Sequence, residues 1–331
     1  MARWGSRSLT NESISVVIVS HNRVSYIRPL LLSLANQSRP PDEVVIVDDA
    51  SKEPIVKHIT DIVDLLQKKS VKVKVYRTVR EIGLGAARSL GAKLAQGDII
   101  VFLDDDVILG SNTIATYVKV YTSLQCDIMA GLCLPLYLCD RNEYPKWWDE
   151  RVLGGIIAVR NDIAYLNSIR PEDYVYGCNF AVAKRVFQSL KGFKPWLGRI
   201  KGTLLSGEEW DFVARAVKKG FKVCFVARAI AYHLIPPTKL HISRVWKMAV
   251  GIGKTRCILS YEGILSTALS RYLLLSAIAI FKDLDYIFIN LIRMLLRKNA
   301  ANLVKGIYNI ICHLTTIFAC KSTLLEIKPL S

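Results

Sequence analysis

Three clusters of carboxylate residues have the types and spacing that metal-ion and acid–base chemistry would need. They are Asp48-Asp49, Asp104-Asp105-Asp106, and Glu208-Glu209 followed by Asp211. Carboxylate oxygens held close together are the hard ligands that Mg²⁺ and Mn²⁺ prefer, and these ions commonly bind substrate phosphates as well. A separate carboxylate can instead accept a proton from a hydroxyl group. Metal binding at one cluster and proton transfer at another would together support the displacement of a phosphate leaving group.

Helix capping is the simpler explanation for two of these clusters. Asp48 and Asp49 precede a predicted helix, and the acids from Glu208 to Asp211 begin an amphipathic helix that ends near Lys218-Lys219. Acids at the start of a helix and lysines at its end both complement the helix dipole. A cap needs only one such residue, however, and capping does not account for three consecutive aspartates after a Phe-Leu strand. For that cluster, solvated loop acids are the alternative to a metal site.

Short apolar runs rich in β-branched residues alternate with helical patterns over the first 110 residues. The predicted strands are Ile14–Val19, Glu43–Val47, Val71–Tyr76 and Asp98–Leu103, and the predicted helices are Tyr26–Gln37, Pro54–Lys69 and Gly83–Ala95. Apolar runs without polar alternation are typical of strands buried on both faces, so they indicate βαβ units and a mostly parallel sheet. Ligands of such sheets bind beyond the carboxyl ends of the strands. Ser20–Arg23 and the first two acidic clusters all follow strands at that edge.

The second half of the chain has weaker signals. Pro135–Asp173 is rich in loop-forming residues and contains Trp147-Trp148. Two further strands are predicted at Tyr174–Val182 and Phe221–Val226, and His233 follows the second of them, at a predicted strand end. These strands would extend the sheet beyond its βαβ part.

Composition excludes two classes of protein. The chain has 331 residues, with 45 Lys and Arg against 28 Asp and Glu, a net charge of +17, and 51% hydrophobic residues. Disordered polyelectrolytes combine high charge with low hydrophobicity, and this chain does not. Its length also suits a large core rather than a small disulfide-stapled domain. Basic proteins of this kind usually bind polyanions such as nucleic acid, an anionic membrane surface or phosphorylated small molecules.

The eight cysteines include no C-x-x-C pair. Because Cys178, Cys224 and Cys312 lie inside apolar stretches, we expect buried, reduced cysteines in an intracellular protein, without zinc or redox functions. The N-terminus has no apolar run long enough for a signal peptide.

The C-terminal third combines positive charge with apolar runs. Residues 236–331 contain 13 Lys and Arg and four acids, so they carry +9 of the total charge. Their longest uncharged run, Gly306–Cys320, has 15 residues, fewer than the roughly 20 that a membrane span needs. This pattern predicts amphipathic helices at an anionic membrane surface. Simple packing on the rest of the protein is one alternative. A membrane span is another, because Leu303–Cys320 contains a single charged residue, Lys305.

Eight segments together resemble the family 2 glycosyltransferases, inverting enzymes of the GT-A fold that use nucleotide-diphospho-sugars. In the family's order they are Ser15–Arg23, Val47–Ser51, Gly83–Arg88, Phe102–Asp106, Gly177–Asn179, Gly192-Phe193, Gly207–Asp211 and Tyr232-His233. The resemblance covers about residues 14–256. It implies an α/β fold with a mostly parallel central sheet and flanking helices, here followed by a C-terminal amphipathic helical extension.

The resemblance, together with the charged and apolar composition of the C-terminal third, divides the chain. Residues 1–13 would form a tail, and residues 14–235 the GT-A catalytic domain. Within that domain, 14–110 would be the nucleotide-binding half and 111–235 the acceptor half. Residues 236–331 would form a helical, basic and hydrophobic membrane-associated region, which would place the protein at the cytoplasmic face of the cell membrane, as a peripheral or monotopic protein.

On the donor side, the resemblance assigns functions to particular residues. Those implied to bind the nucleotide-sugar are Ser20, Asn22, Arg23, Asp49, Arg88, Asp104 and Asp105. Within this group, Asp49 would accept a hydrogen bond from the base, and Arg88 would lie near the nucleotide or its phosphates. The implied ligands of an Mg²⁺ or Mn²⁺ cofactor are Asp104, Asp106 and His233.

On the acceptor side, Glu209 falls where the family has its general base. The family usually has an aspartate in a Glu-Asp pair, whereas this chain has Glu208-Glu209, which leaves Asp211 as a second candidate. The other residues implied on this side are Trp147, Trp148, Asn179 and Trp210, with the tryptophans as a surface on which a sugar could stack.

The expected activity is therefore metal-assisted in-line transfer of a sugar from a nucleotide-diphospho-sugar to a hydroxyl group of a lipid-linked or growing glycan. A nucleotidyltransferase is disfavoured because Ser20–Val24 lacks the glycines of a phosphate-binding loop. A non-catalytic scaffold that binds the donor is a second alternative, which the intact acidic motifs disfavour. Nucleic-acid binding is suggested only by the net charge, and the acidic sheet edge argues against it.

Overall fold

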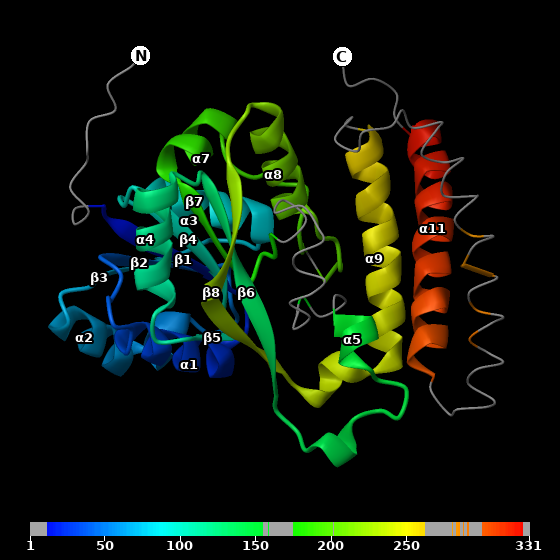
Figure 1. Cartoon of the computed structure of the whole chain (residues 1–331), viewed down its shortest axis with the longest axis horizontal. Coiled ribbons are helices and arrows are strands. Elements are labelled where there is room, and N and C mark those ends of the chain that lie inside the picture. Colours follow the sequence, from blue (N-terminus) through cyan, green and yellow to red (C-terminus); the bar gives the residue numbers. More distant parts are fainter. Residues whose placement is uncertain are drawn as a thin grey trace.

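A central β-sheet organises the part of the chain that the computed structural model describes (Figure 1). The described residues are 12–154, 158, 175–200, 202–261, 280, 283, 284, 287, 290 and 300–326. Among them, eight strands form one sheet in the order β3-β2-β1-β4-β7-β6-β8-β5. The strands are β1 Ile14–Ser20, β2 Glu43–Asp48, β3 Lys72–Arg77, β4 Ile99–Asp104, β5 Val107–Leu109, β6 Ile128–Tyr137, β7 Asn179–Ala183 and β8 Val223–Ile235.

The first four strands are parallel, as the sequence predicted, and each begins and ends within one residue of its predicted bounds. Val16 on β1 pairs with Val44 on β2 and with Val101 on β4, and all three side chains are fully buried. β7 then runs antiparallel between β4 and β6, so the sheet is mixed. The acidic ends of β2 and β4 lie at the carboxyl edge of its parallel half.

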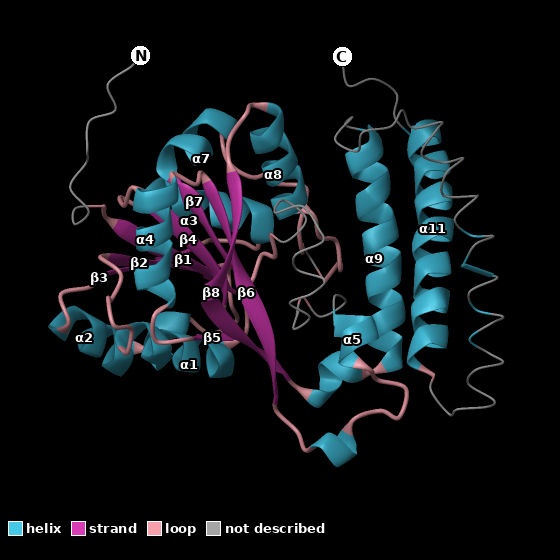
Figure 2. Ribbon diagram, viewed as in Figure 1, coloured by secondary structure: helices cyan, strands magenta, loops and turns pink. Residues whose placement is uncertain are grey.

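Helices cover both faces of the sheet (Figure 2). The short and long helices of this part are α1 Val24–Ala35, η1 Ile55–His58, α2 Thr60–Lys68, α3 Leu84–Leu94, α4 Thr113–Leu124, η2 Arg141–Glu143, α5 Glu150–Leu153, α7 Lys184–Leu190 and α8 Glu208–Lys218. Because side chains alternate along a strand, Val16 packs with α1, α2 and α4, whereas the next residue, Val17, packs with α3, α7 and α8. Gly91 allows α3 to lie close to the sheet, since a Cβ atom there would come within 2.5 Å of Val17.

The second half of the sheet differs from its prediction in the length of one strand. β8 runs through Ile235, well beyond the predicted end at Val226, because it pairs with β6 along almost the whole length of β6. His233 therefore lies within β8, two residues before its end at Ile235 and opposite Val107 of β5. β7 begins at Asn179, and the predicted start of this strand, Tyr174, lies outside the described residues.

Two long helices stand beside the sheet domain: α9, Ile242–Tyr261, and α11, Ala301–Glu326, with the short helix η5, Pro237–Leu240, leading into α9 (Figure 1). α9 and α11 run parallel and in contact, and the Thr316 hydroxyl donates to the Gly253 carbonyl oxygen. A Cβ atom at Gly253 would lie 2.5 Å from the Cys312 carbonyl oxygen, so glycine permits this close approach. Ala301–Cys320 is, within the described residues, the one helix long and apolar enough to cross a membrane.

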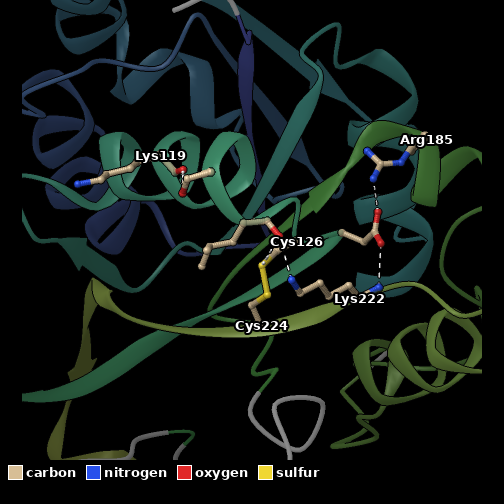
Figure 3. Close-up of a disulfide and its surroundings, with 8 residues drawn as sticks. Lys119, Cys126, Arg185, Lys222 and Cys224 are labelled. Atoms are coloured by element: carbon tan, nitrogen blue, oxygen red, sulfur yellow. Dashed lines mark hydrogen bonds and ion pairs between the residues drawn. A yellow bond between two sulfur atoms is a disulfide. The ribbon is translucent and has the colours of Figure 1, made fainter. Parts of the chain in front are cut away.

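The prediction that the cysteines are reduced was wrong for four of them. Cys126 forms a disulfide with Cys224, and Cys257 forms one with Cys320. The first bond arises because β6 and β8 pair side by side, and it lies next to the ion pair of Arg185 with Asp127 (Figure 3). The second joins α9 to α11. Because the bonded cysteines are 98 and 63 residues apart in the sequence, no local pattern indicated either bond. The remaining cysteines, Cys133, Cys139, Cys178 and Cys312, are free.

Three of the predicted regions lie partly outside the described residues. Only residues 12 and 13 of the predicted tail are described, residues 159–174 of the predicted acceptor half are not, and nor are most residues of the C-terminal region between 262 and 299. The proposed domain boundaries stay predictions.

Candidate functional site

A cavity of about 380 Å³ opens beyond the carboxyl ends of β1 and β4 and is bounded on another side by α9. This is the position at which ligands bind in open α/β sheets, and its volume lies within the range of ligand sites. Its lining includes His21, Arg23, Asp49, Arg88, Asp104, Asp105, Asp106, Arg199, Glu208, Glu209, Trp210, His233, Lys239, Arg244 and Met248. All three acidic clusters of the sequence therefore contribute at least one residue to a single cavity.

Asp49 supports the loop that forms one wall of the cavity. Its carboxylate accepts hydrogen bonds of 2.9 Å from the backbone N–H groups of Ile82 and Gly83, and one of 3.0 Å from the Thr78 hydroxyl. Gly83 has φ +87°, a conformation that side chains rarely adopt. Asp49 thus fixes the turn before α3, and its oxygens retain lone pairs for a ligand.

The second acidic cluster is surrounded by cations. Lys239 Nζ lies 2.6 Å from Asp106 Oδ2, Arg23 pairs with the same oxygen, and His233 Nε2 lies 3.3 Å from Asp106 Oδ1. Burial alone would raise the pKa of Asp106, but these partners hold it well below its usual range. Asp106 is therefore a carboxylate that stays ionised.

Asp105, the middle residue of this cluster, has a different environment. Arg23 pairs with it at 2.9 Å, and the Ser20 hydroxyl donates to its other oxygen at 2.6 Å. Burial is the largest influence on this carboxyl group and, with the nearby charge of Asp106, raises its pKa to about 7 despite Arg23. Ser20 thus acts by positioning Asp105 and does not itself line the cavity.

Arg88 joins the second acidic cluster to the third. Its Nη2 lies 2.6 Å from Asp104 and its Nη1 lies 2.6 Å from Glu208, and the side chain is only 2% exposed. Nη2 also donates to the Gly177 carbonyl oxygen, and a Cβ atom at Gly177 would lie 2.7 Å from that nitrogen. The resemblance implied that Arg88 would lie near nucleotide phosphates. Although Arg88 lines the cavity, its guanidinium group is already bonded to carboxylates.

Glu209 lies at the start of α8, after Gly207, whose φ of +92° turns the chain into the helix. The Glu209 side chain is buried, and its Oε2 has no hydrogen-bond partner within the described part of the chain. Burial, and then the adjacent charge of Glu208, raise the pKa of Glu209 well above its ordinary range, although the positive charge of Arg88 opposes this. An unpaired carboxylate of raised pKa is well suited to accept a proton.

Asp211, the second candidate base, lies away from the cavity. Two residues along an α-helix correspond to about 200° of rotation, so Asp211 faces away from the direction of Glu209. There it is fully buried, pairs with Lys194 at 3.0 Å, and accepts a hydrogen bond from Arg215 at 2.8 Å. The geometry corrects the sequence-based alternative: Asp211 holds α8 to its neighbours and is not exposed to a substrate.

The residues predicted on the acceptor side do not gather at the cavity. Asn179 is fully buried, where it accepts from the Tyr117 hydroxyl and donates to two backbone carbonyl oxygens. Trp147 and Trp148 pack against the cluster formed by α9 and α11. The structure therefore does not bring these three side chains together at the cavity: Asn179 is fully buried, and Trp147 and Trp148 are partly buried against the two helices. Trp210 does line the cavity and is 36% exposed.

Asn22, predicted to bind the nucleotide, instead ties two loops together. Its side-chain oxygen accepts from the Lys52 N–H at 2.7 Å, and its own N–H donates to the Ser51 hydroxyl at 2.9 Å. Its φ of +56° is a conformation that asparagine tolerates better than most residues. Asn22 therefore shapes the loop from which Arg23 reaches the cavity.

Asp106 and His233 fit a divalent cation that is bound together with substrate. Carboxylate and imidazole are suitable ligands for Mn²⁺, and the buried Asp106 Oδ1 faces His233 Nε2 at 3.3 Å. Within the described residues, no group of three or more His, Cys, Asp or Glu side chains could hold a metal ion by itself. Mg²⁺ and related ions are commonly held by one or two carboxylates plus phosphates and water, so two protein ligands suffice. Asp104, the third predicted ligand, is bonded to Arg88 through one oxygen.

Three cations at the cavity were not among the predicted site residues. Lys239 follows His233 by six positions and is buried against it, with Nζ 2.8 Å from His233 Nε2. Arg199 comes from the segment before α8, and Arg244 from the first turn of α9. Basic residues are common in this chain, so only their position in the fold distinguishes these three.

Parts of this sequence are similar to those of known proteins. The sequence profile of the family described as Glycosyl transferase family 2 matches residues 15–190. A poly(ribitol-phosphate) beta-glucosyltransferase of Bacillus spizizenii is 36% identical over 121 residues, which are 36% of this chain and 18% of that protein. A chondroitin synthase of Escherichia coli is 26% identical over 259 residues, covering 70% of this chain and 36% of that protein. The chain spans less than half the length of the curated relatives it matches.

Solved structures support the fold. The mannosyltransferase from Pyrobaculum calidifontis in complex with GDP-Man and Mn²⁺ superposes with a TM-score of 0.62 at 14% identity, covering 96% of this chain and 91% of that one. At this identity the likeness concerns the fold alone. The expected GT-A architecture, an α/β sheet with flanking helices, is thereby confirmed.

Proposed function

This chain belongs to glycosyl transferase family 2, and from that premise we propose that it transfers a sugar from a nucleotide-diphospho-sugar to a hydroxyl group of an acceptor. One observation carries the proposal. A cation-rich carboxylate cluster at Asp106 and an unpaired buried carboxylate, Glu209, line the same cavity. Displacement of a diphosphate from a sugar carbon needs positive charge beside the leaving group and a proton acceptor beside the attacking hydroxyl.

Near the diphosphate, positive charge would come from Arg23, Lys239 and His233, which surround Asp106. Negative charge builds on the leaving phosphate during the displacement, and fixed cations in a cavity stabilise that charge. When bound at Asp106 and His233, a divalent cation supplies further positive charge without any proton transfer. The side chains of this wall otherwise orient the donor, and Asp49 shapes the loop beside it.

On the opposite side, Glu209 would take the proton from the acceptor hydroxyl as that oxygen attacks the sugar carbon. Attack from the face opposite the diphosphate inverts the configuration at this carbon. A positioned carboxylate typically contributes about 10²–10⁴-fold to the rate. Trp210, next to Glu209 and partly exposed in the cavity, provides an aromatic face on which an acceptor sugar could pack.

A donor screen tests this proposal. Purified protein in mild detergent is mixed with UDP-, GDP- or dTDP-sugars and Mn²⁺, and its thermal unfolding is recorded. A ligand that binds only the folded protein raises the melting temperature, so at least one donor should stabilise the protein and, with an acceptor mixture, should release its nucleoside diphosphate. Absence of any stabilisation across all three nucleotide classes would contradict the proposed function.

We propose a lipid-linked or growing glycan as the acceptor, at the surface of the cell membrane. The names of two relatives, a poly(ribitol-phosphate) beta-glucosyltransferase and a chondroitin synthase, support a polymeric acceptor.

α11 supports the membrane location, because one of its faces packs on α9 while Leu314 and Phe318 are exposed, Phe318 by 65%. Exposed apolar side chains in a region with a net charge of +9, residues 236–331, suit an anionic membrane surface.

Vesicle sedimentation tests the proposed location. The protein should sediment with vesicles that contain phosphatidylglycerol and should bind pure phosphatidylcholine vesicles less. Replacing Leu314 and Phe318 together by serine should reduce sedimentation, whereas replacing exposed Leu124 on α4 should not. If the wild-type protein stays in the supernatant with both kinds of vesicle, the location is wrong, while the proposed transfer reaction would be unaffected.

A further inference from the structure

Two cysteines without a disulfide bond lie side by side next to the cavity. Cys133 is on β6, and Cys178 directly precedes β7, the strand that pairs with β6. Their sulfur atoms are 2.7 Å apart and share a hydrogen bond, and the two residues are only 2% and 1% exposed. Cys178 also lines the cavity. Two oxidisable groups in direct contact therefore form part of the wall of a ligand site.

A disulfide between Cys133 and Cys178 would need little movement. Bonded sulfur atoms are about 2.05 Å apart, so a shift of less than about 1 Å brings these two to bonding distance. Once one sulfur is oxidised, the thiol of its partner is already in place to attack it. Among the free cysteines in the described part of the chain, only these two have sulfur atoms in contact.

The backbone beside Cys178 holds residues of both acidic walls. The Gly177 carbonyl oxygen accepts a hydrogen bond of 2.7 Å from Arg88, and the Cys178 carbonyl oxygen accepts one of 3.4 Å from the Asp104 N–H. Arg88 is in turn bonded to Glu208. A displacement of this backbone would therefore reach the arginine that joins the two walls.

Formation of the bond would also remove a hydrogen bond at the cavity. The Cys178 thiol donates to the Ala158 carbonyl oxygen at 3.8 Å, and Ala158 lines the cavity as well. The sulfur atoms of a disulfide carry no hydrogen, so oxidation would deprive this oxygen of the thiol donor. The bond would thus change contacts at the cavity through both the backbone and the side chain of Cys178.

We propose that Cys133 and Cys178 are a modification site at which a peroxide converts the two thiols to a disulfide, and that this bond slows sugar transfer. The effect on transfer rests on the proposed function, whereas formation of the bond does not. A redox function departs from the expectation drawn from the spacing of the cysteines.

The reaction with hydrogen peroxide consumes two thiols and releases two water molecules. The Cys178 thiolate attacks one peroxide oxygen, the O–O bond breaks, and the leaving hydroxide takes up the thiol proton as water. The Cys133 sulfur then attacks the sulfur of the resulting sulfenic acid. The S–O bond breaks, and a second water leaves with the proton of Cys133. The two sulfurs lose two electrons, which reduce the peroxide.

The surroundings of Cys178 make this reaction slow rather than unfavourable. Its hydrogen bond with Cys133, and then burial, raise the pKa of the Cys178 thiol well above its ordinary range, so little thiolate is present. The scarcity of thiolate limits the rate, while the closeness of the two sulfurs favours the disulfide at equilibrium. Because oxidant reaches Cys178 through the cavity, bound nucleotide should slow the reaction further.

Peptide mass mapping after peroxide treatment tests the modification. The wild-type protein is incubated with hydrogen peroxide, its remaining thiols are alkylated after unfolding, and it is digested without reduction. A pair of peptides joined through Cys133 and Cys178, lighter by two hydrogen atoms than the separate peptides, is expected. Dithiothreitol should remove the link, and saturating UDP or GDP should slow its formation.

Turnover of the same samples tests the consequence. Oxidation should lower kcat of the wild-type protein by at least about tenfold, and dithiothreitol should restore it, because misplacing catalytic groups by about 1 Å can cost about a hundredfold. Cys133→Ala keeps Cys178 at the cavity but removes its partner, so peroxide should change its kcat by less than about twofold. Cys312→Ala removes a buried free cysteine from α11 and should respond as the wild type does.

The inference is overturned if no linked peptide forms at a peroxide concentration that oxidises half-buried Cys139. Linked protein with unchanged kcat, or an equal loss of kcat in Cys133→Ala, would also overturn it. If Cys133→Ala does not fold, Cys133→Ser serves in its place. If the reduced wild-type protein transfers no sugar from any donor, the proposed function has failed, and the linked peptide still decides whether the pair is modified.

Discussion

The two acidic walls of the cavity contain the same chemical group in opposite environments. At the Asp106 wall, a buried carboxylate is surrounded by Arg23, Lys239 and His233, and its pKa lies well below the usual range. At the Glu209 wall, a buried carboxylate lies next to another carboxylate, one of its oxygens has no hydrogen-bond partner among the described residues, and its pKa is raised.

Charge compensation, rather than residue type, therefore separates the binding of cations at one wall from the acceptance of a proton at the other. A carboxylate that stays ionised can hold cations, and through them a diphosphate. A carboxylate with a raised pKa is a stronger base and can take a proton from a hydroxyl group. The sequence supplies carboxylates at both walls, and the neighbours that the fold places around them decide what each can do.

Arg88 maintains the difference between the two walls. One arm of its guanidinium group is bonded to Asp104 and the other to Glu208. Burial would lower the pKa of Arg88, but the charges of Asp104, Glu208 and Glu209 raise it, so it stays charged. Arg88 Nη1 is bonded to Glu208 and makes no hydrogen bond to Glu209. Glu208 is thus a positioning residue, and Glu209 Oε2 has no hydrogen-bond partner among the described residues.

The largest effect is expected for Glu209→Gln, which removes the proton acceptor but keeps the shape of the side chain. Turnover should fall by at least about a hundredfold, while nucleoside diphosphate affinity stays within about twofold, because the amide cannot accept the proton. Steady-state kinetics and titration with UDP or GDP measure the two quantities. Glu53→Gln, at an exposed residue away from the cavity, is the matched control. Full turnover in Glu209→Gln would show that Glu209 is not the proton acceptor.

The next effect is expected for Asp106→Asn, at the other wall. This change removes the carboxylate that Arg23 and Lys239 compensate and that would hold the divalent cation. Affinity for UDP or GDP in Mn²⁺ should fall by roughly tenfold or more, and the affinity gained on adding Mn²⁺ should largely disappear. Titrations with and without Mn²⁺ provide the measurement. Equal dependence on Mn²⁺ in variant and wild type would show that Asp106 holds no metal ion.

A smaller effect, on pH dependence, is expected for Glu208→Gln. A base works only when ionised, so kcat/KM of the wild-type enzyme should fall as the pH falls through the raised pKa of Glu209, well above the ordinary range for glutamate. Replacing Glu208 removes a repelling charge and frees one arm of Arg88. Both changes lower the pKa of Glu209, so the acidic limb should move to lower pH.

The pH profile of kcat/KM for the two proteins checks this prediction. At pH values above both limbs, the rate of Glu208→Gln should stay within about tenfold of the wild type, because the base is retained but weakened. Glu208→Asp keeps the charge and should leave the limb near its wild-type position. An acidic limb that does not move in Glu208→Gln would show that the two glutamates are not coupled.

The parts of the fold that local sequence determines were predictable. β1, β2 and β4 are buried strands made of short apolar runs, so these strands and the acids that follow β2 and β4 could be located from the sequence. β3 is a partly exposed edge strand, and its β-branched residues indicated it. The order of the motifs indicated that Glu209 belongs to the site. Its raised pKa comes from burial and from the neighbouring charge of Glu208. Pairings between distant segments were not predictable in this way. The length of β8 depends on β6, and the disulfides depend on which cysteines the fold brings together.

The same reasoning explains the residues that sequence analysis missed or misplaced. Lys239 and Arg199 are two of 45 basic residues, and only their distance from Asp106 in the folded chain distinguishes them. Trp147 and Trp148 were predicted as a stacking surface for a sugar, and the structure packs both, partly buried, against the hydrophobic cluster of α9 and α11. In each case the partner lies far along the chain.

The smallest effect on activity is expected for Asp211→Asn, which tests whether position on α8 matters more than composition. Asp211 is as acidic as Glu209 and only two residues away, but it is paired with Lys194 and Arg215 outside the cavity. Its replacement should leave turnover within about threefold, because no substrate reaches it. The variant should nevertheless lose about 1–3 kcal/mol of folding stability, since a buried ion-pair partner is removed while Lys194 and Arg215 remain partly solvated. Kinetics and urea unfolding measure the two effects, and a hundredfold loss of turnover with unchanged stability would transfer the function of base from Glu209 to Asp211.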